Sequence, residues 1–246
     1  MSPAAIAFLP GLALGSFLNV VAVRVPLRRS IVHPPSSCGS CRAPIAWYDN
    51  VPIVSYLALR GRCRSCAERI SWKYPAVELA TALLVAATVL AFGLTPRAGV
   101  AAFFCAALVA VSVTDLEHRL IPNRIVVPAA AVVLVAQTAI DPSPEWAISA
   151  AGAAGFLLLA ALAYPAGMGM GDVKLALLLG AALGHTVPVA MMLAMVAALV
   201  PAAWLFARHG SAARKMGIPF GPFLALGGVT ALFAGNAILH AYFSVI

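Results

Sequence analysis

Long apolar runs without a charged side chain alternate with short polar stretches along most of this chain. A helix needs roughly 20 mostly apolar residues to cross the hydrocarbon core of a bilayer. The uncharged runs cover residues 1–23, 79–96, 98–114, 125–140, 146–171, 175–207 and 216–246. The pattern therefore predicts membrane-spanning helices at about 4–23, 75–93, 98–114, 122–140 and 146–165, and further spans after residue 174.

The run 175–207 admits either one crossing or two short crossings that turn at Gly184 and His185. Loops on the cytoplasmic side of a membrane carry an excess of Lys and Arg. One crossing would leave three basic residues outside the cell, and two crossings return them to the cytoplasm: Arg208, Arg214 and Lys215. We therefore expect eight spans, a short sixth span, an outer N-terminus, and every basic residue except Arg97 in the cytoplasm.

Composition excludes the main classes of soluble protein. Of the 246 residues, 63% are hydrophobic and 10% are charged, whereas soluble domains carry roughly 25% charged residues. This excludes a soluble cytosolic enzyme, a secreted disulfide scaffold and a disordered chain. The net charge of +8 does not indicate a nucleic-acid partner, because nine of the 16 basic residues lie between Arg24 and Lys73. That clustering is typical of a cytoplasmic loop of a protein whose partner is the lipid bilayer.

The polar stretch 24–74 contains two C-x-x-C pairs separated by 21 residues, Cys38 with Cys41 and Cys63 with Cys66. Four thiolates in two such pairs suit tetrahedral Zn²⁺. Two disulfides or a redox pair are the alternatives, and a cytoplasmic location disfavours stable disulfides. We predict a four-cysteine zinc site that holds this small insert together. The fifth cysteine, Cys105, is predicted to be a packing residue.

Two aspartates are expected at one cytoplasmic boundary of the membrane. Asp115 ends the span 98–114, and Asp172 begins the sixth span after a glycine-rich segment. Carboxylates at membrane depth are energetically costly and usually functional. A converging pair can share one proton and activate a water, as in aspartic proteases. Two alternatives remain: caps or ion-pair partners of Arg119 and Lys174, or the coupling pair of an ion-coupled transporter.

Six motifs, in order along nearly the whole chain, resemble the prepilin peptidases, also called type IV leader peptidases. These are polytopic aspartic peptidases of bacteria. The fifth motif is a GxGD signature. The motifs are residues 15–26, the two C-x-x-C pairs, residues 71–78, Asp115 with residues 121–123, residues 169–174 and residues 219–223.

The resemblance implies a membrane endopeptidase that removes the basic leader of type IV prepilins or of type II secretion pseudopilins. The cut lies on the cytoplasmic side, after a Gly and typically before a Phe. The two aspartates that match the catalytic motifs, Asp115 and Asp172, would carry the hydrolysis. Neighbouring motif residues would support the active site or the substrate: Pro122, Asn123, Gly169, Gly171 and Lys174.

Members with the cysteine-bearing insert typically also N-methylate the new N-terminal residue with S-adenosylmethionine. Motif match alone makes four residues candidates for binding this methyl donor: Gly15, Asn19, Arg24 and Glu78. Each also has a structural interpretation. Gly15 can serve close helix packing, and Glu78 can pair with an arginine of the insert. A peptidase with a purely structural zinc insert, and the transporter, remain the alternatives.

We therefore expect an all-α polytopic protein of the bacterial cytoplasmic (inner) membrane, with about eight transmembrane helices and a small cytoplasmic zinc-binding insert. The expected parts are a first transmembrane helix at 1–23, a zinc-binding insert and methyltransferase region at 24–74, and a peptidase domain of about seven helices at 75–246. The expected cofactors are structural Zn²⁺ and S-adenosylmethionine. The sequence does not indicate an oligomeric state.

Overall fold

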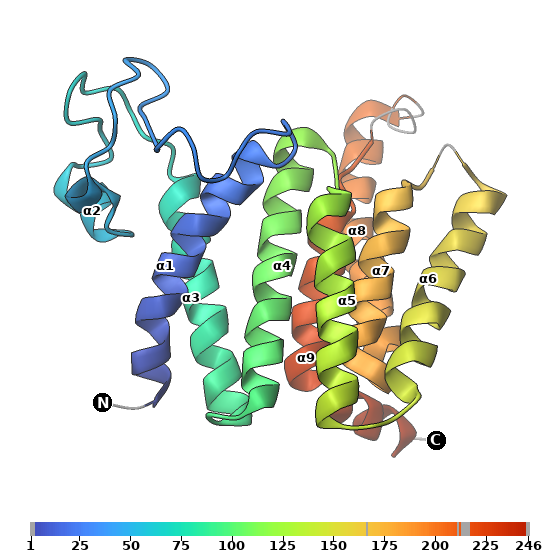
Figure 1. Ribbon diagram of the computed structural model, residues 1–246. Coiled ribbons are helices and arrows are strands. Elements are labelled where there is room, and N and C mark those ends of the chain that lie inside the picture. The colour runs from blue at the N-terminus through green and yellow to red at the C-terminus, as the bar shows by residue number, and fades with distance from the viewer. Residues whose placement is uncertain (1–2, 166, 211, 213–216, 245–246) are drawn as a thin grey trace. The chain divides into compact units, whose positions relative to one another are not determined.

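The computed structural model describes residues 3–165, 167–210, 212 and 217–244 (Figure 1). The described part is helical, with isolated bridges but no strand of a sheet. The all-α prediction is confirmed. The elements are α1 (Pro3–Arg24), η1 (Trp47–Asn50), α2 (Val54–Ala58), α3 (Lys73–Phe92), α4 (Pro96–His118), α5 (Asn123–Ile140), α6 (Glu145–Ala163), α7 (Met170–Leu183), η2 (Gly184–Thr186), α8 (Val187–His209) and α9 (Gly221–Phe243).

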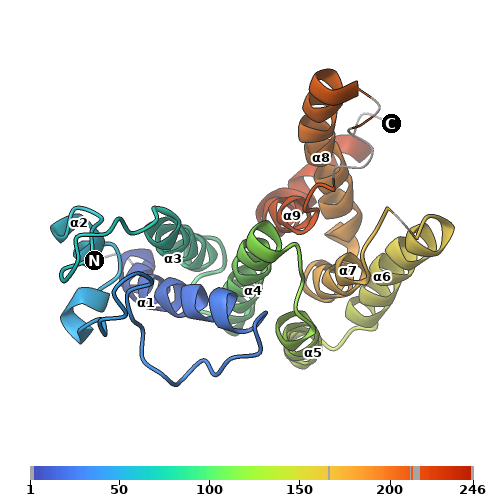
Figure 2. The ribbon, with the colours of Figure 1, turned by 90° about the horizontal axis from the view of Figure 1, so that it is seen from above.

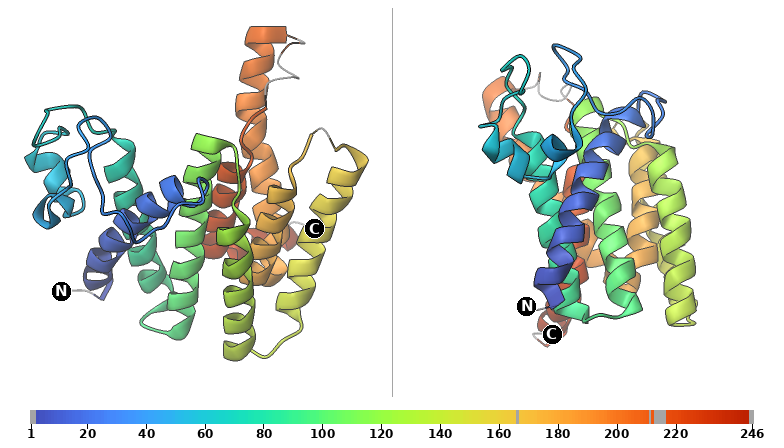
Figure 3. Two further views of the ribbon diagram at one scale, coloured as in Figure 1. Left: turned by 45° about the horizontal axis from the view of Figure 1, so that its top comes forward. Right: turned by 60° about the vertical axis from the view of Figure 1, so that its left-hand side comes forward.

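Seven stretches of the described residues are long and apolar enough to cross a membrane, and one of them is the 40-residue stretch Met170–His209. The short helix η2 breaks this stretch at the predicted turn, and α8 then returns toward the end at which α7 begins (Figure 3). If α7 and α8 are counted as two separate crossings, the described residues contain the eight membrane-spanning helices that the sequence predicts. Two of the basic residues that favoured this turn, Arg214 and Lys215, lie outside the described residues.

The sixth helix is short, as expected. At roughly 1.5 Å per residue, the 14 residues of α7 extend about 21 Å, against a hydrocarbon core of about 30 Å. The turn after α7 therefore lies where backbone polar groups cannot rely on water and need partners within the protein.

The chain forms two compact units, Met1–Ala110 and Val111–Ile246. In the first unit, α1 packs along α3 (Figure 2). Two glycines of α1 face the backbone of α3 at short range. A Cβ at Gly11 would lie 2.7 Å from the Ala82 Cα, and a Cβ at Gly15 would lie 2.6 Å from the Glu78 Cα. Since real Cβ atoms do not approach other atoms this closely, the crossing requires glycine at both positions.

In the second unit, α7 lies among α5, α6 and α9 (Figure 2). Nine of its 14 residues are buried. A helix that is apolar all round is typical of such a central position. Gly180 lies against the backbone of α6 at Ser149, where a Cβ would overlap the carbonyl group. The helix that begins with Asp172 is thus held from several sides.

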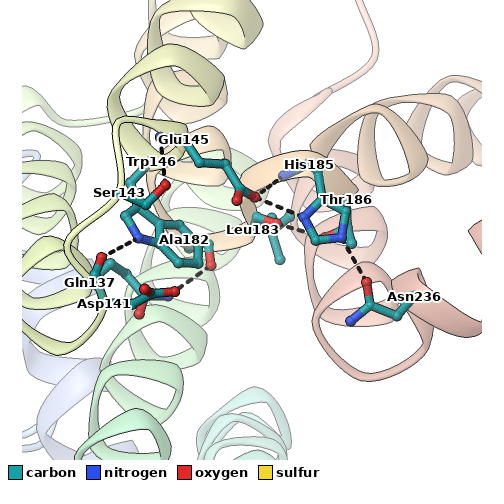
Figure 4. Close-up of polar contacts among 10 residues, drawn as sticks. All are labelled: Gln137, Asp141, Ser143, Glu145, Trp146, Ala182, Leu183, His185, Thr186 and Asn236. Atoms are coloured by element: carbon teal, nitrogen blue, oxygen red, sulfur yellow. Dashed lines mark hydrogen bonds and ion pairs between the residues drawn. The ribbon is translucent and has the colours of Figure 1, made fainter.

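A polar cluster supports the turn between α7 and α8 (Figure 4). The Oε1 atom of Glu145, at the start of α6, accepts the backbone N–H of His185 at 2.8 Å and lies 2.7 Å from the His185 Nδ1 atom. The His185 Nε2 atom lies 2.9 Å from the Oδ1 atom of Asn236 on α9. One histidine therefore links the turn to two neighbouring helices.

The last carbonyl groups of α7 also have partners in this cluster (Figure 4). Gln137 donates its side-chain amide to the Ala182 carbonyl at 3.0 Å, and the Thr186 hydroxyl donates to the Leu183 carbonyl at 2.9 Å. The final turn of a helix leaves such carbonyls without an intrahelical donor. These side chains supply the donors that water would supply outside a membrane.

We expect His185→Ala to destabilise the second unit. The substitution removes both side-chain contacts of the imidazole and leaves the Glu145 carboxylate with one fewer partner. Loss of such hydrogen bonds costs about 0.5–1.5 kcal/mol each, which a lower midpoint of thermal unfolding in detergent would reveal. His209→Ala is the matched control, since that exposed imidazole contacts only a carbonyl of its own helix among the contacts described. Equal midpoints for the two variants would contradict a supporting role for His185.

Candidate functional site

Asp115 is a buried carboxylic acid in the last turn of α4, with 6% of its surface exposed. Its Oδ2 atom accepts the backbone N–H of Gly221 at 2.9 Å. Gly221 is the first residue of α9, where a backbone N–H has no partner inside the helix. A Cβ at Gly221 would lie 2.8 Å from the same oxygen. The close approach of Asp115 to α9 therefore requires glycine at this position.

Asp172 lies in the first turn of α7. Its Oδ2 atom accepts the backbone N–H of Gly169 at 3.3 Å, and its own backbone N–H donates to the Gly169 carbonyl at 3.1 Å. The first bond is the carboxylate half of a capping box, in which a carboxylate satisfies an N-terminal backbone donor, and the second is a backbone turn. The carboxyl group is thus held at the end of α7 next to the glycine-rich segment.

The structure brings the two aspartates together within the second unit. Their carboxyl groups are near enough for the charge of Asp115 to act on Asp172, and the charge of Arg119 acts on Asp115. The start of α7 packs against the segment that follows α4: a Cβ at Gly171 would lie 2.9 Å from the Ile121 Cβ. Glycine at 171 therefore allows α7 to begin beside the end of α4.

The remaining predicted support residues link α5 to α7. Lys174 donates its Nζ proton to the Asn123 Oδ1 atom at 2.8 Å. Pro122 is the residue before α5, and its extended backbone (φ −70°, ψ 125°) ends the loop and lets the helix begin at Asn123. Lys174 thus binds the neighbouring helix through its side chain, although the sequence had also suggested it as an ion-pair partner of Asp172.

We expect Gly221→Ala to impair catalysis with little loss of folded protein. The added methyl group overlaps the Asp115 carboxyl group, which must then move away from the start of α9. A misplacement of about 1 Å at a reacting group costs roughly 100-fold in rate. The measurement is the rate of substrate cleavage by purified protein, with Gly217→Ala as control, since the nearest atom there is 3.8 Å away. An unchanged rate for Gly221→Ala would contradict the tight contact.

The four cysteines of the insert form a cluster that can hold a metal ion. One sulfur from each lies within 4.8 Å of all the others, and the Cys38 and Cys66 Sγ atoms are 3.8 Å apart. Four thiolates about 2.3 Å from a tetrahedral zinc ion lie about 3.8 Å from one another. The donor set therefore fits zinc. All four are free thiols, as is the buried Cys105 of α4.

The two cysteine pairs have the same local backbone, repeated after 25 residues. In each, the N–H of the first cysteine donates to the carbonyl five residues later, from Cys38 to Ala43 and from Cys63 to Glu68. The residue after the second cysteine has positive φ, 59° at Arg42 and 57° at Ala67. Two copies of one tight turn thus present their sulfurs to a common point.

Two electrostatic features suit the insert to its metal. Backbone N–H groups of Cys41 and Ser40 face the Cys38 thiol and lower its pKa, whereas the other cysteines of the cluster raise the pKa of Cys66. Thiolate is the form that binds metal. Arg64 donates to both carboxylate oxygens of Asp49 at 2.7 and 2.6 Å, and this bidentate pair lowers the pKa of Asp49. The pair ties η1 to the second cysteine turn.

Three of the four candidate methyl-donor residues meet where α1 crosses α3. Gly15 lies against Glu78, and Asn19 donates its side-chain amide to the Tyr74 carbonyl at 3.1 Å. The Glu78 Oε2 atom accepts the backbone N–H of Ile53 at 2.8 Å. Arg24 lies at the end of α1 instead, where it donates to the Ser30 carbonyl at 3.0 Å.

Comparison with known proteins identifies the family. Residues 9–92 match the bacterial peptidase A24 N-terminal domain, and residues 102–203 match the type IV leader peptidase family. A Bacillus subtilis protein named prepilin leader peptidase/N-methyltransferase is 39% identical over 245 residues, which cover 96% of each chain. This chain belongs to the type IV leader peptidase family. A Pseudomonas aeruginosa protein of the same name is 35% identical over 94% of this chain and 90% of its own.

Within this type IV leader peptidase, the two family matches contain the two sites described above. The first contains the four-cysteine cluster and the crossing of α1 and α3, and the second contains Asp115 and Asp172. A Myxococcus xanthus protein, also named prepilin leader peptidase/N-methyltransferase, is 40% identical over 71% of this chain and 54% of its own. No solved structure matches the chain. The family makes the chain a multi-pass membrane enzyme.

Three contacts of the sites have no local signal in the sequence of this type IV leader peptidase. Gly221 belongs to the last motif, but its N–H bond to Asp115 joins residues 106 positions apart. Ile121 likewise belongs to a motif that does not indicate its contact with Gly171. Ile53 donates to Glu78 from a positive-φ conformation of 60°, for which a β-branched residue gives no local signal.

Proposed function

We propose that Asp115 and Asp172 are the catalytic dyad of a membrane endopeptidase that cleaves the leader of type IV prepilins or type II secretion pseudopilins. One observation carries this assignment. A buried carboxyl group, held by a helix N-terminal N–H, lies within range of the charge of a second carboxyl group. Two carboxyl groups that come into contact can share one proton, which is the condition for acid–base catalysis by aspartic peptidases, and we propose that Asp115 and Asp172 do so. The relatives are named as prepilin leader peptidases.

The two carboxyl groups divide the proton transfers. The ionised carboxylate accepts a proton from a water molecule, whose oxygen attacks the scissile carbonyl carbon. The protonated partner donates its proton to the carbonyl oxygen, which gives a neutral tetrahedral intermediate. Collapse of this intermediate breaks the C–N bond as the leaving amine takes up a proton. Gly169, which is exposed beside Asp172, carries no side chain that would obstruct an extended substrate strand.

We further propose that the dyad and the insert face the cytoplasm and that the N-terminus lies outside. The distribution of basic residues supports this orientation, since nine of the 16 lie between Arg24 and Lys73. Basic loops remain on the cytoplasmic side of a membrane. A dyad at that boundary can reach the junction between the apolar helix of a prepilin and its leader.

The insert is proposed to hold structural zinc on its four cysteines and to serve methylation of the new N-terminus. S-Adenosylmethionine supplies an electrophilic methyl group when it is bound. Gly15, Asn19, Arg24 and Glu78 are the residues proposed to bind it. The carboxylate of Glu78 has the sign of charge that a sulfonium group needs, and it is tied to the insert by Ile53.

The direct test is product analysis. Purified protein in detergent is incubated with a prepilin, with and without S-adenosylmethionine, and the product is read by mass spectrometry. We expect mature pilin in both reactions, and a product heavier by one methylene group only with the methyl donor. Cleavage without methyl transfer would leave the insert a structural element. Failure of the folded protein to cleave several prepilins would contradict the peptidase assignment.

We expect Glu78→Gln to separate the two activities. The amide keeps an oxygen that can accept the Ile53 N–H but removes the negative charge. Methyl transfer should fall by about tenfold or more, equivalent to about 1.4 kcal/mol, while leader cleavage is unchanged. Glu68→Gln, at an exposed carboxylate of the insert, is the control. Equal rates of methyl transfer by the two variants would contradict the proposal that Glu78 binds S-adenosylmethionine.

A further inference from the structure

The insert exposes large apolar side chains on η1, α2 and the segment between them. The exposed fractions are 83% at Trp47, 67% at Leu57 and 61% at Val54. We name this set the apolar knob, and it consists of Trp47, Tyr48, Val51, Val54 and Leu57. Contiguous exposed apolar surface marks an interaction site.

The apolar knob is built by specific contacts. The Ser55 hydroxyl donates to the Tyr48 carbonyl at 2.9 Å and accepts the Val51 N–H at 3.1 Å, which joins α2 to η1. The Arg64 guanidinium, paired with Asp49, lies 5.6 Å from the centre of the Tyr48 ring. The knob therefore has a defined conformation while its apolar side chains remain exposed.

The position of the apolar knob beside α3 identifies what covers it. Ile53, the residue before α2, donates its N–H to Glu78. Glu78 lies five residues inside α3, about 8 Å along the helix axis from Lys73. Figure 1 shows α2 level with the upper turns of α3, rather than beyond its end. The knob is thus held beside the end of a membrane-spanning helix, at the level of the membrane interface.

The positive charge of the residues around the apolar knob favours contact with a negatively charged surface. Residues 24–73 contain nine basic and two acidic side chains, a net charge of +7. Anionic lipid headgroups attract basic segments with about 1 kcal/mol per residue. Trp and Tyr favour the interface between headgroups and acyl chains. A basic leader of a substrate would be repelled by the same charge.

We propose that the apolar knob inserts into the interfacial layer of an anionic phospholipid bilayer beside α3. Trp47, Val54 and Leu57 enter the boundary between headgroups and acyl chains, and neighbouring arginines bind lipid phosphates. The bilayer is the occupant of this surface, and the insert is anchored to the membrane at a third place besides α1 and α3. This anchoring stands independently of the methyltransferase proposal.

Fluorescence quenching tests the anchoring. A variant retains Trp47 alone, with Trp72, Trp146 and Trp204 replaced by Phe, and is reconstituted in phosphatidylglycerol vesicles that contain acyl-brominated lipid. We expect the lipid to quench most of the Trp47 emission and the emission to be blue-shifted. The control carries its only tryptophan at the exposed position Ser40 (Ser40→Trp), where aqueous iodide should quench instead. Equal behaviour of the two tryptophans would overturn the proposal.

Two further measurements distinguish lipid from a second copy of the chain and test the preference for anionic lipid. Dilution of the protein in lipid leaves the quenching unchanged if lipid covers the knob, whereas quenching that appears only on dilution indicates a second copy of the chain and overturns the proposal. Hydrogen exchange of the unmodified protein needs no substitution. Residues 47–58 should exchange more slowly in phosphatidylglycerol nanodiscs than in phosphatidylcholine nanodiscs, and equal exchange would contradict binding to anionic lipid.

Discussion

Asp115→Asn and Asp172→Asn are each expected to lower the rate of leader cleavage by roughly 1,000-fold or more, because groups that act as one catalytic unit fail together. Asparagine has nearly the shape of aspartate and can still accept the Gly221 N–H at position 115. It cannot carry the proton that the dyad exchanges. The loss should therefore appear in kcat, measured by mass spectrometry of the pilin product, while the midpoint of thermal unfolding changes little.

The double variant distinguishes a shared role from two separate ones. Asp115→Asn with Asp172→Asn should be no slower than either single variant, because either change alone disables the dyad. Glu117→Gln is the matched control, since it neutralises an exposed carboxylate two residues further along α4. Near-normal cleavage by either aspartate variant would refute the dyad and revive the interpretation of these residues as helix-end caps.

Cys38→Ser or Cys63→Ser is expected to release the metal from the insert and to unfold it. A structural zinc ion contributes about 10–16 kcal/mol of apparent binding energy to small domains, and the insert has few buried side chains to replace it. The metal content measured by atomic emission should fall from near one ion per chain to near zero. Leader cleavage should persist, because Asp115 and Asp172 belong to the other compact unit.

Cys105→Ala is the control for the metal prediction. Cys105 is buried in α4 and is not part of the cysteine cluster, so its removal should leave the metal content unchanged. Thiol titration of the denatured, metal-free protein separates the alternatives. Five reactive thiols agree with a metal site, whereas one reactive thiol would indicate two disulfides and would contradict it.

The positions of the helices followed from the sequence alone. Each uncharged run contains most of at least one helix, and the run 175–207 contains parts of two, α7 and α8. In a membrane the backbone must satisfy its own hydrogen bonds, and an α-helix does so within one segment. The turn at Gly184 was predicted from loop charge and is present, with φ of 56° at that glycine. The spacing of the two cysteine pairs likewise predicted the four-cysteine cluster, because each C-x-x-C turn is encoded by neighbouring residues.

Only the tertiary structure decided which segments meet. The bond from Gly221 to Asp115, the contact of Glu78 with Ile53 and the histidine that links α6 to α9 join residues far apart in sequence. Helices that are apolar all round, such as α7, have no polar face to indicate which side a neighbour covers. Their partners are chosen by close packing at small residues, and a sequence of small and apolar side chains does not specify that choice by periodicity.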